Sequence, residues 1–224
     1  MSDDFEILTF GNEAEPLVVI DDFFSDLEWL RRLAAQSEFG ITSPHYPGIR
    51  AQADPNYLGE RMQTLRTVLT KVFGMGQGAS MVECAFSIVT TPPTELKPIQ
   101  RLPHFDTTDP KRLALLHYLS PDETGGTAFY RHAATGFEIV PPDRLELYSK
   151  AVQDEVSADG PPPYEYFRGQ TSRFERIGHV EAKPNRMVIY RSYRLHSGDI
   201  PSDLPLLADP ATGRLTLNTF LQGR

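Results

Sequence analysis

The first apolar pattern along the chain predicts a buried strand followed closely by a helix. In the segment PLVVIDDFF from Pro16, three β-branched residues at 18–20 stand next to acidic ones, which favours a short strand. Ser25 and Glu28 then have the spacing of a capping box, and apolar residues recur at helical intervals after them. We therefore predict a helix from Ser25 to about Ser37.

A second helix is marked at both of its ends. Asp54 is placed to cap it, Pro55 suits its first position, and Gly74 follows the last apolar residue. Between these ends, five apolar residues lie on one face: Leu58, Met62, Leu65, Leu69 and Val72. This stripe predicts a helix that packs on a core.

From residue 81 onward the pattern becomes that of short strands. MVECAFSIVTT alternates so that Cys84, Phe86 and Ile88 share one face. Further strands are predicted at 112–119, 126–130, 136–140, 177–182, 186–191 and 214–221. The Pro, Gly and Asp clusters between them favour antiparallel connections, so a mostly β fold with N-terminal helices (α+β), of barrel or jelly-roll type, is expected.

One long segment, 131–178, interrupts the run of strands. It contains a predicted helix at 143–153 and the stiff loop PPPYEYF at 161–167. Its aromatic residues could pack the loop onto the barrel or form a wall for a substrate, and the sequence leaves both readings open. We predict one domain over 1–224, with a helical support region at 1–80 and a β core at 81–224.

Composition and charge narrow the classes of function. The 224 residues carry a net charge of −8, which disfavours binding to nucleic acid, and no apolar run is long enough to span a membrane. The N-terminus lacks the features of a secretion signal, so a cytoplasmic location is expected. Arginines gathered between Arg168 and Arg194 are either a solvated face or a site for an anionic substrate group. No pattern indicates an oligomeric state.

The residues that could hold a metal are histidines and carboxylates. Cys84 is the only cysteine, and we expect it to be a small buried hydrophobe. His104 and Asp106 stand two residues apart, so on an extended segment both side chains face one way. His196 follows the apolar run MVIY and precedes a turn, which places it at a strand end. Two imidazoles and one carboxylate suit Fe(II) with open coordination positions.

Arg214 is a candidate for binding a small acid. It follows Gly213 and begins an alternating strand in which Thr216 and Asn218 share its face. An arginine inside the fold needs an anionic partner, and a dicarboxylate would supply one, whereas an arginine on an exposed edge would not need it.

Several stretches, in this order, resemble the prolyl 4-hydroxylase-like branch of the Fe(II)/2-oxoglutarate dioxygenases. They are LVVIDDFFSDLEWL, the HFD of 104–106, LLHYLSPDETGGTAFY, and KPNRMVIYRSYRLHSGDIP leading to Arg214. The resemblance implies a double-stranded β-helix (jelly roll, cupin-like) core that uses Fe(II), 2-oxoglutarate and O₂. It makes His104, Asp106 and His196 the iron ligands, and Arg214 and Tyr118 the residues that bind the far carboxylate of 2-oxoglutarate.

The activity implied by this resemblance is hydroxylation of a C–H bond in a peptide, an amino acid or a small metabolite. Two departures from the family pattern are a longer gap between His196 and Arg214 and the long 131–178 segment. The alternatives are an inactive β-helix that serves as a binding or scaffold domain, and a cupin-like metalloenzyme that does not use 2-oxoglutarate. Specificity is expected to lie in the loops 38–53 and 131–178. His45 is read as incidental and His117 as structural.

Overall fold

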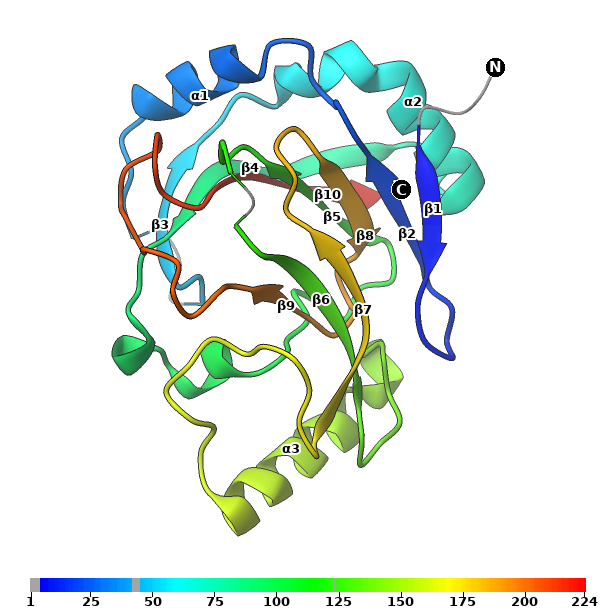
Figure 1. Ribbon diagram of the computed structural model, residues 1–224. Helices are drawn as coiled ribbons and strands as arrows, with labels where there is room; N and C mark the ends of the chain where they lie inside the picture. Colours follow the sequence, from blue (N-terminus) through cyan, green and yellow to red (C-terminus); the bar gives the residue numbers. More distant parts are fainter. Residues whose placement is uncertain (1–4, 42–44, 123) are drawn as a thin grey trace.

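Two antiparallel sheets lie face to face in the computed structural model, which describes residues 5–41, 45–122 and 124–224 (Figure 1). The larger sheet has the order β1 (Glu6–Thr9), β2 (Pro16–Ile20), β8 (Met187–Arg191), β5 (Arg112–Tyr118), β10 (Leu215–Gly223), β4 (Ala79–Val89), β3 (Gly48–Gln52). The smaller sheet has the order β7 (Phe174–Glu181), β6 (Gly126–His132), β9 (His196–Asp199). This arrangement is a double-stranded β-helix, so the predicted fold class is confirmed.

Helices cover the outer face of the larger sheet (Figure 1). They are α1 (Leu27–Ala35) and α2 (Met62–Thr67), the second flanked by a 3₁₀ turn at Pro55–Arg61 and a π turn at Val68–Val72. Leu30 and Ala34 of α1 and Leu65 of α2 are buried in one cluster with Phe86, Ile88 and other outward side chains of the sheet. The region 1–80 is therefore more than a helical support, because β1, β2 and β3 also belong to the larger sheet.

The N-cap of α1 differs from the predicted one. Asp26, not Ser25, accepts the N–H of Trp29 at 2.8 Å. Ser25 instead donates its N–H and its hydroxyl to the carboxylate of Glu60, at 2.8 and 2.9 Å. Ser25, which the local spacing predicted as the N-cap, thus makes a tertiary contact with Glu60 instead.

The second predicted helix is confirmed in place but not in regular geometry. Asp54 accepts the N–H of Asn56 at 2.9 Å, and Pro55 is the first helical residue, as expected. Leu58 and Leu65 are buried, whereas Met62 is 42% exposed. The change from 3₁₀ to α to π winding moves side chains away from the single stripe that a uniform helix would give.

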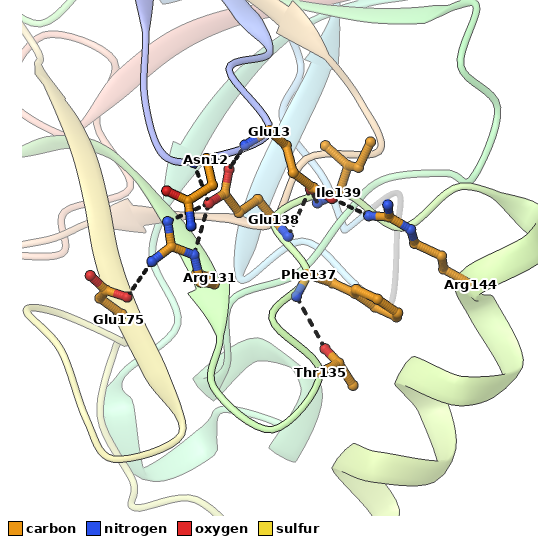
Figure 2. A network of polar contacts seen from close by, with 9 residues as sticks. All are labelled: Asn12, Glu13, Arg131, Thr135, Phe137, Glu138, Ile139, Arg144 and Glu175. Carbon is orange, nitrogen blue, oxygen red and sulfur yellow. Dashed lines mark hydrogen bonds and ion pairs between the residues drawn. The ribbon is translucent and has the colours of Figure 1, made fainter.

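The predicted strand at 136–140 does not form. Only Ile139 makes an isolated bridge, to Arg194. The N–H groups of Glu138 and Ile139 both donate to the carboxylate of Glu13, at 3.0 Å each, so they are not available to a sheet partner (Figure 2). The other predicted strands are present.

The long segment packs on the smaller sheet. Its helix α3 (Leu145–Asp159) runs beyond the predicted 143–153, ends at Gly160 with φ 85°, and lies on the side remote from α1 and α2 (Figure 1). Tyr148 and Phe167 are buried in one cluster with Tyr130 and Phe174 of that sheet. Phe167 therefore packs the 161–167 loop onto the core, which was one of the two predicted roles of its aromatic residues. Tyr164 is 62% exposed. Among the described residues, no helix is long and apolar enough to cross a bilayer.

Candidate metal centre

The structure brings the three predicted metal ligands together from two segments. His104 and His196 form an antiparallel bridge, with both N–H···O contacts at 2.8 Å. The N–H of Asp106 donates to the carbonyl of Ser192 at 2.8 Å, which holds the next turn of the first segment beside the second. His196 begins β9 rather than ending a strand, because MVIY belongs to β8 and a turn intervenes.

The donor atoms of His104, Asp106 and His196 all lie within 4.8 Å of one another. His196 Nε2 is 3.9 Å from Asp106 Oδ1, too far for a hydrogen bond. His196 Nδ1 lies 2.9 Å from the carbonyl of Arg194, so this nitrogen carries the proton and donates it. The lone pair of Nε2 is consequently directed at the space that the three side chains share, as a metal ligand requires.

The electrostatics of the cluster also fit a divalent cation. Burial lowers the pKa of both His104 and His196 to about 4, and the two imidazoles are therefore neutral at pH 7. The side chain of Asp106 is 24% exposed and that of His196 is 7% exposed, so the cluster opens on one side. Neutral imidazoles and a carboxylate with an open face are a donor set suited to Fe(II).

Arg214 is inside the fold, as expected for an acid-binding residue. It is 6% exposed and directly precedes β10. Its Nε and Nη2 donate to the carbonyls of Thr124 and Gly126, at 3.0 Å each. Gly125 between them has φ 84°, a conformation that glycine adopts without strain. The turn from Thr124 to Gly126 thus holds the guanidinium in place.

Tyr118 lies beside Arg214. Its ring centroid is 5.9 Å from the guanidinium carbon, and the side chain is 1% exposed. The phenol oxygen is 2.7 Å from the hydroxyl of Thr127. Tyr118 also pairs across the sheet with Thr216, so both side chains face the interior between the sheets. The two residues predicted to bind the cosubstrate, Arg214 and Tyr118, therefore lie next to each other in the interior.

Sequence reasoning placed Asn218 on the face of Arg214 but missed the other polar groups of the same interior. Three buried side-chain atoms make no hydrogen bond of normal geometry to a described residue: Tyr46 Oη, Ser192 Oγ and Asn218 Oδ1. Ser87 and Thr216 lie near Tyr46, and Asp106 lies near Ser192. Arg50, 8% exposed, is also found here, with Nε bound to Ser87 at 3.0 Å and Nη1 to Glu83 at 2.6 Å. Polar atoms without partners are rare in protein interiors and are typical of a site for a polar ligand.

Other histidines and the arginines between 168 and 194 have partners that lie outside the metal cluster. His132 contacts Glu155 and Thr135, and His179 lies 3.1 Å from Asp199. Cys84 is buried, as expected. The six arginines between 168 and 194 each have a partner: Arg168 and Arg176 with Asp199, Arg173 with Asp159, Arg186 with Asp21, Arg191 and Arg194 with Glu15. This favours a structural role over recognition of an anion.

The chain is similar in structure to several solved proteins, two of which contain a metal and 2-oxoglutarate. HygX of Streptomyces hygroscopicus with nickel and 2-oxoglutarate has 14% identity and a TM-score of 0.54 over 94% of this chain and 84% of that one. The epimerase SnoN with Fe³⁺, α-ketoglutarate and nogalamycin RO has 12% and 0.51 over 93% and 79%. A Pseudomonas putida prolyl-4-hydroxylase has 13% and 0.46 over 95% of both. HygX and SnoN show that the chain has the fold of the Fe/2-oxoglutarate dioxygenases, as the resemblance implied for its fold.

Residues 2–221 match the family described as "Family of unknown function (DUF6445)", and the chain belongs to that family. No curated protein matches it.

Proposed function

We propose that this protein is an Fe(II)/2-oxoglutarate-dependent oxygenase that hydroxylates a C–H bond of a peptide, an amino acid or a small metabolite. His104, Asp106 and His196 are the iron ligands in this proposal, and Arg214 with Tyr118 binds the far carboxylate of 2-oxoglutarate. The observation that supports it most is the convergence of the three donor atoms within 4.8 Å, with the proton of His196 fixed on Nδ1.

When bound, iron would supply the activation of O₂ that hydroxylation needs. The protein's own residues position the reactants. The Arg194 carbonyl fixes the tautomer and the ring of His196, and the Ser192 carbonyl fixes the backbone of Asp106. Arg214, held by two carbonyls, presents its remaining N–H groups to a carboxylate, which orients an extended dicarboxylate toward the metal ligands.

The first prediction is spectroscopic. Anaerobic addition of Fe(II) and 2-oxoglutarate to the metal-free protein should give a visible charge-transfer band. Asp106→Ala should abolish this band, because it removes the one anionic ligand of the proposed set. Asp154→Ala on α3 is the matched control, since its carboxylate is 66% exposed and pairs only with Lys150 on the same helix. A wild-type protein without the band would favour a binding domain over an oxygenase.

Turnover is tested separately. Oxygen-dependent formation of succinate by the iron-loaded protein should exceed the substrate-free background when a suitable candidate substrate is present. Arg214→Met should abolish 2-oxoglutarate binding while Fe(II) binding is kept. If Arg214→Met leaves oxidation of the substrate intact and this oxidation does not require added 2-oxoglutarate, the protein is a metalloenzyme that does not use 2-oxoglutarate.

A further inference from the structure

Two tyrosines outside the predicted cosubstrate pair also lie near Arg214. Tyr46 lies just before β3, within the segment 38–53, and Tyr166 belongs to the 161–167 loop. Burial raises the pKa of both phenols, and the positive charge of Arg214 acts against that effect at both. A negative charge on the phenol of Tyr46 would also raise the pKa of Tyr166. Both side chains are therefore within electrostatic reach of the guanidinium, one from each loop that was expected to set specificity.

The hydroxyl groups around Arg214 differ in their hydrogen bonds. Tyr166 donates to the carbonyl of Thr91 at 2.7 Å, and Tyr118 bonds to Thr127 at 2.7 Å. The hydroxyl of Tyr46 is buried and lies near the hydroxyls of Ser87 and Thr216, but it makes no hydrogen bond of normal geometry to a described residue. A buried donor left unpaired is costly, and such a group commonly indicates a missing acceptor.

The surroundings of Tyr46 indicate what kind of acceptor is missing. The guanidinium carbon of Arg50 is 5.5 Å from its ring centroid, and the charges of Arg50 and Arg214 both act on its phenol. Two N–H groups of Arg214 are bound to carbonyls, and its other N–H groups have no partner among the described residues. Free donors between two cations are complementary to an anion with several oxygens, such as a carboxylate.

We propose that Tyr46 is a third binding residue for the carboxylate that Arg214 holds, and that its hydroxyl donates a hydrogen bond to the far carboxylate of 2-oxoglutarate. This inference rests on the proposed function. It assigns Tyr46 to the cosubstrate pocket, whereas the sequence had placed the segment 38–53 among the determinants of substrate specificity.

The test compares two 2-oxo acids that share the metal-binding end. The far carboxylate is present in 2-oxoglutarate and absent from 2-oxobutyrate. Anaerobic titrations of the Fe(II)-loaded protein, followed by the charge-transfer band or by calorimetry, give Kd for each acid. Tyr46→Phe keeps the ring and removes only the hydroxyl. It should weaken 2-oxoglutarate binding about tenfold to a hundredfold, as expected for a hydrogen bond to a charged group. Binding of 2-oxobutyrate should change less than about twofold.

Tyr166→Phe is the matched control, because its hydroxyl is already bound to Thr91. It should change the Kd for 2-oxoglutarate by less than about threefold. Thermal unfolding shows whether each variant is folded. If Tyr46→Phe does not fold, Tyr46→Leu, which also lacks the hydroxyl, replaces it in the titrations. Equal affinity of wild type and Tyr46→Phe for 2-oxoglutarate would overturn the inference and leave the proposed function standing. Equal weakening for both acids would assign Tyr46 to packing. A wild type that binds neither acid would refute the proposed function itself.

Discussion

His117 shows how a single side chain can be fixed by its neighbours. It is next to Tyr118 on β5 and faces the opposite side of the sheet, where its ring stacks on Tyr57 at 6.0 Å. Asn185 donates Nδ2 to the carbonyl of Phe24 and accepts the N–H of Phe24 on Oδ1. With the amide orientation settled, Oδ1 accepts from His117 Nε2 at 3.0 Å. His117 Nδ1 is then the unprotonated nitrogen, and it has no partner among the described residues.

Burial lowers the pKa of His117 from 6.5 to about 4, and this makes stability depend on pH. Because the unfolded chain takes up the proton first, the free energy of unfolding falls as pH drops from about 6.5 to about 4. The contribution of His117 to that fall between pH 7 and pH 5 is about 2 kcal/mol.

His117→Gln keeps an N–H donor for Asn185 and cannot be protonated. The lowered pKa values of His104 and His196 act in the same direction in both proteins, so the comparison isolates His117. Urea unfolding at pH 7 and pH 5 should therefore show a smaller loss in the variant, by about 2 kcal/mol. Equal losses in the two proteins would mean that His117 is not the residue that takes up the proton.

At the residue scale, the sequence was informative where spacing and side-chain chemistry coincide. His104 and Asp106 were found because two metal-binding side chains two residues apart face one way, and His196 because it follows a strand. Tyr46 and Ser192 could not be found in this manner. Tyr46 stands among turn residues, and what distinguishes it is a missing partner, which only the three-dimensional arrangement reveals.

Among the elements, the β1–β2 hairpin and the 131–178 segment are joined by one buried carboxylate (Figure 2). Glu138 is 2% exposed and accepts the N–H groups of Asn12 and Glu13 at 2.8 and 3.0 Å. The guanidinium of Arg131 donates twice to the same carboxylate, at 2.8 and 2.6 Å. Burial alone would raise the pKa of Glu138, but these hydrogen bonds outweigh it and lower the pKa.

Glu138→Ala should therefore destabilise the protein by about 2–4 kcal/mol, because two backbone N–H groups and the Nε and Nη2 of Arg131 lose their acceptor. Denaturant unfolding at pH 7 measures this loss. Glu175→Ala is the matched control, since Glu175 pairs with the same arginine but is 55% exposed. Its removal should cost less than about 1 kcal/mol. Similar losses for the two variants would show that the buried network does not stabilise the junction.

This network also explains the main error in predicting elements. The apolar and polar alternation at 136–140 has the period of a strand, but its N–H groups are taken by Glu13, more than a hundred residues earlier. The displaced cap of α1 has the same origin, because Ser25 binds Glu60. Local patterns predicted where most elements lie. Side-chain contacts between distant segments determined whether the 136–140 strand forms and which residue caps α1.

At the scale of the molecule, the pairing of strands was the feature that local sequence patterns predicted least well. Periodicity cannot show that β10 lies between β5 and β4, or that β9 pairs with β6. The jelly-roll order followed from the family resemblance. The single-domain assignment over 1–224 stays a prediction. The position of the long segment was equally hidden, because α3 buries only Tyr148 among its own residues.

The 161–167 loop contacts the segments that carry the proposed metal ligands. Ser197, the residue after His196, donates its hydroxyl to the carbonyl of Phe167 at 3.3 Å. Arg101, three residues before His104, donates Nη1 to the carbonyl of Pro162 at 3.1 Å and Nε to the carbonyl of Leu96 at 2.8 Å. The ring of Tyr164 covers this guanidinium at 3.5 Å. The loop thus supports both sides of the cluster.

Arg101→Met should consequently weaken metal binding although Arg101 is not a ligand. Without the contact to the carbonyl of Pro162, the segment leading to His104 loses this attachment to the loop, and we expect about tenfold lower affinity for the metal, as for other residues that support metal ligands. Mn(II) added to the metal-free protein should raise Tm, and at saturating metal the variant should gain about 1.4 kcal/mol less stabilisation than wild type. Arg173→Met is the control, because Arg173 contacts Glu155 and Asp159 within the long segment alone. A loss of the metal effect in His196→Ala but not in Arg101→Met would show that the loop packs on the core without supporting the metal ligands.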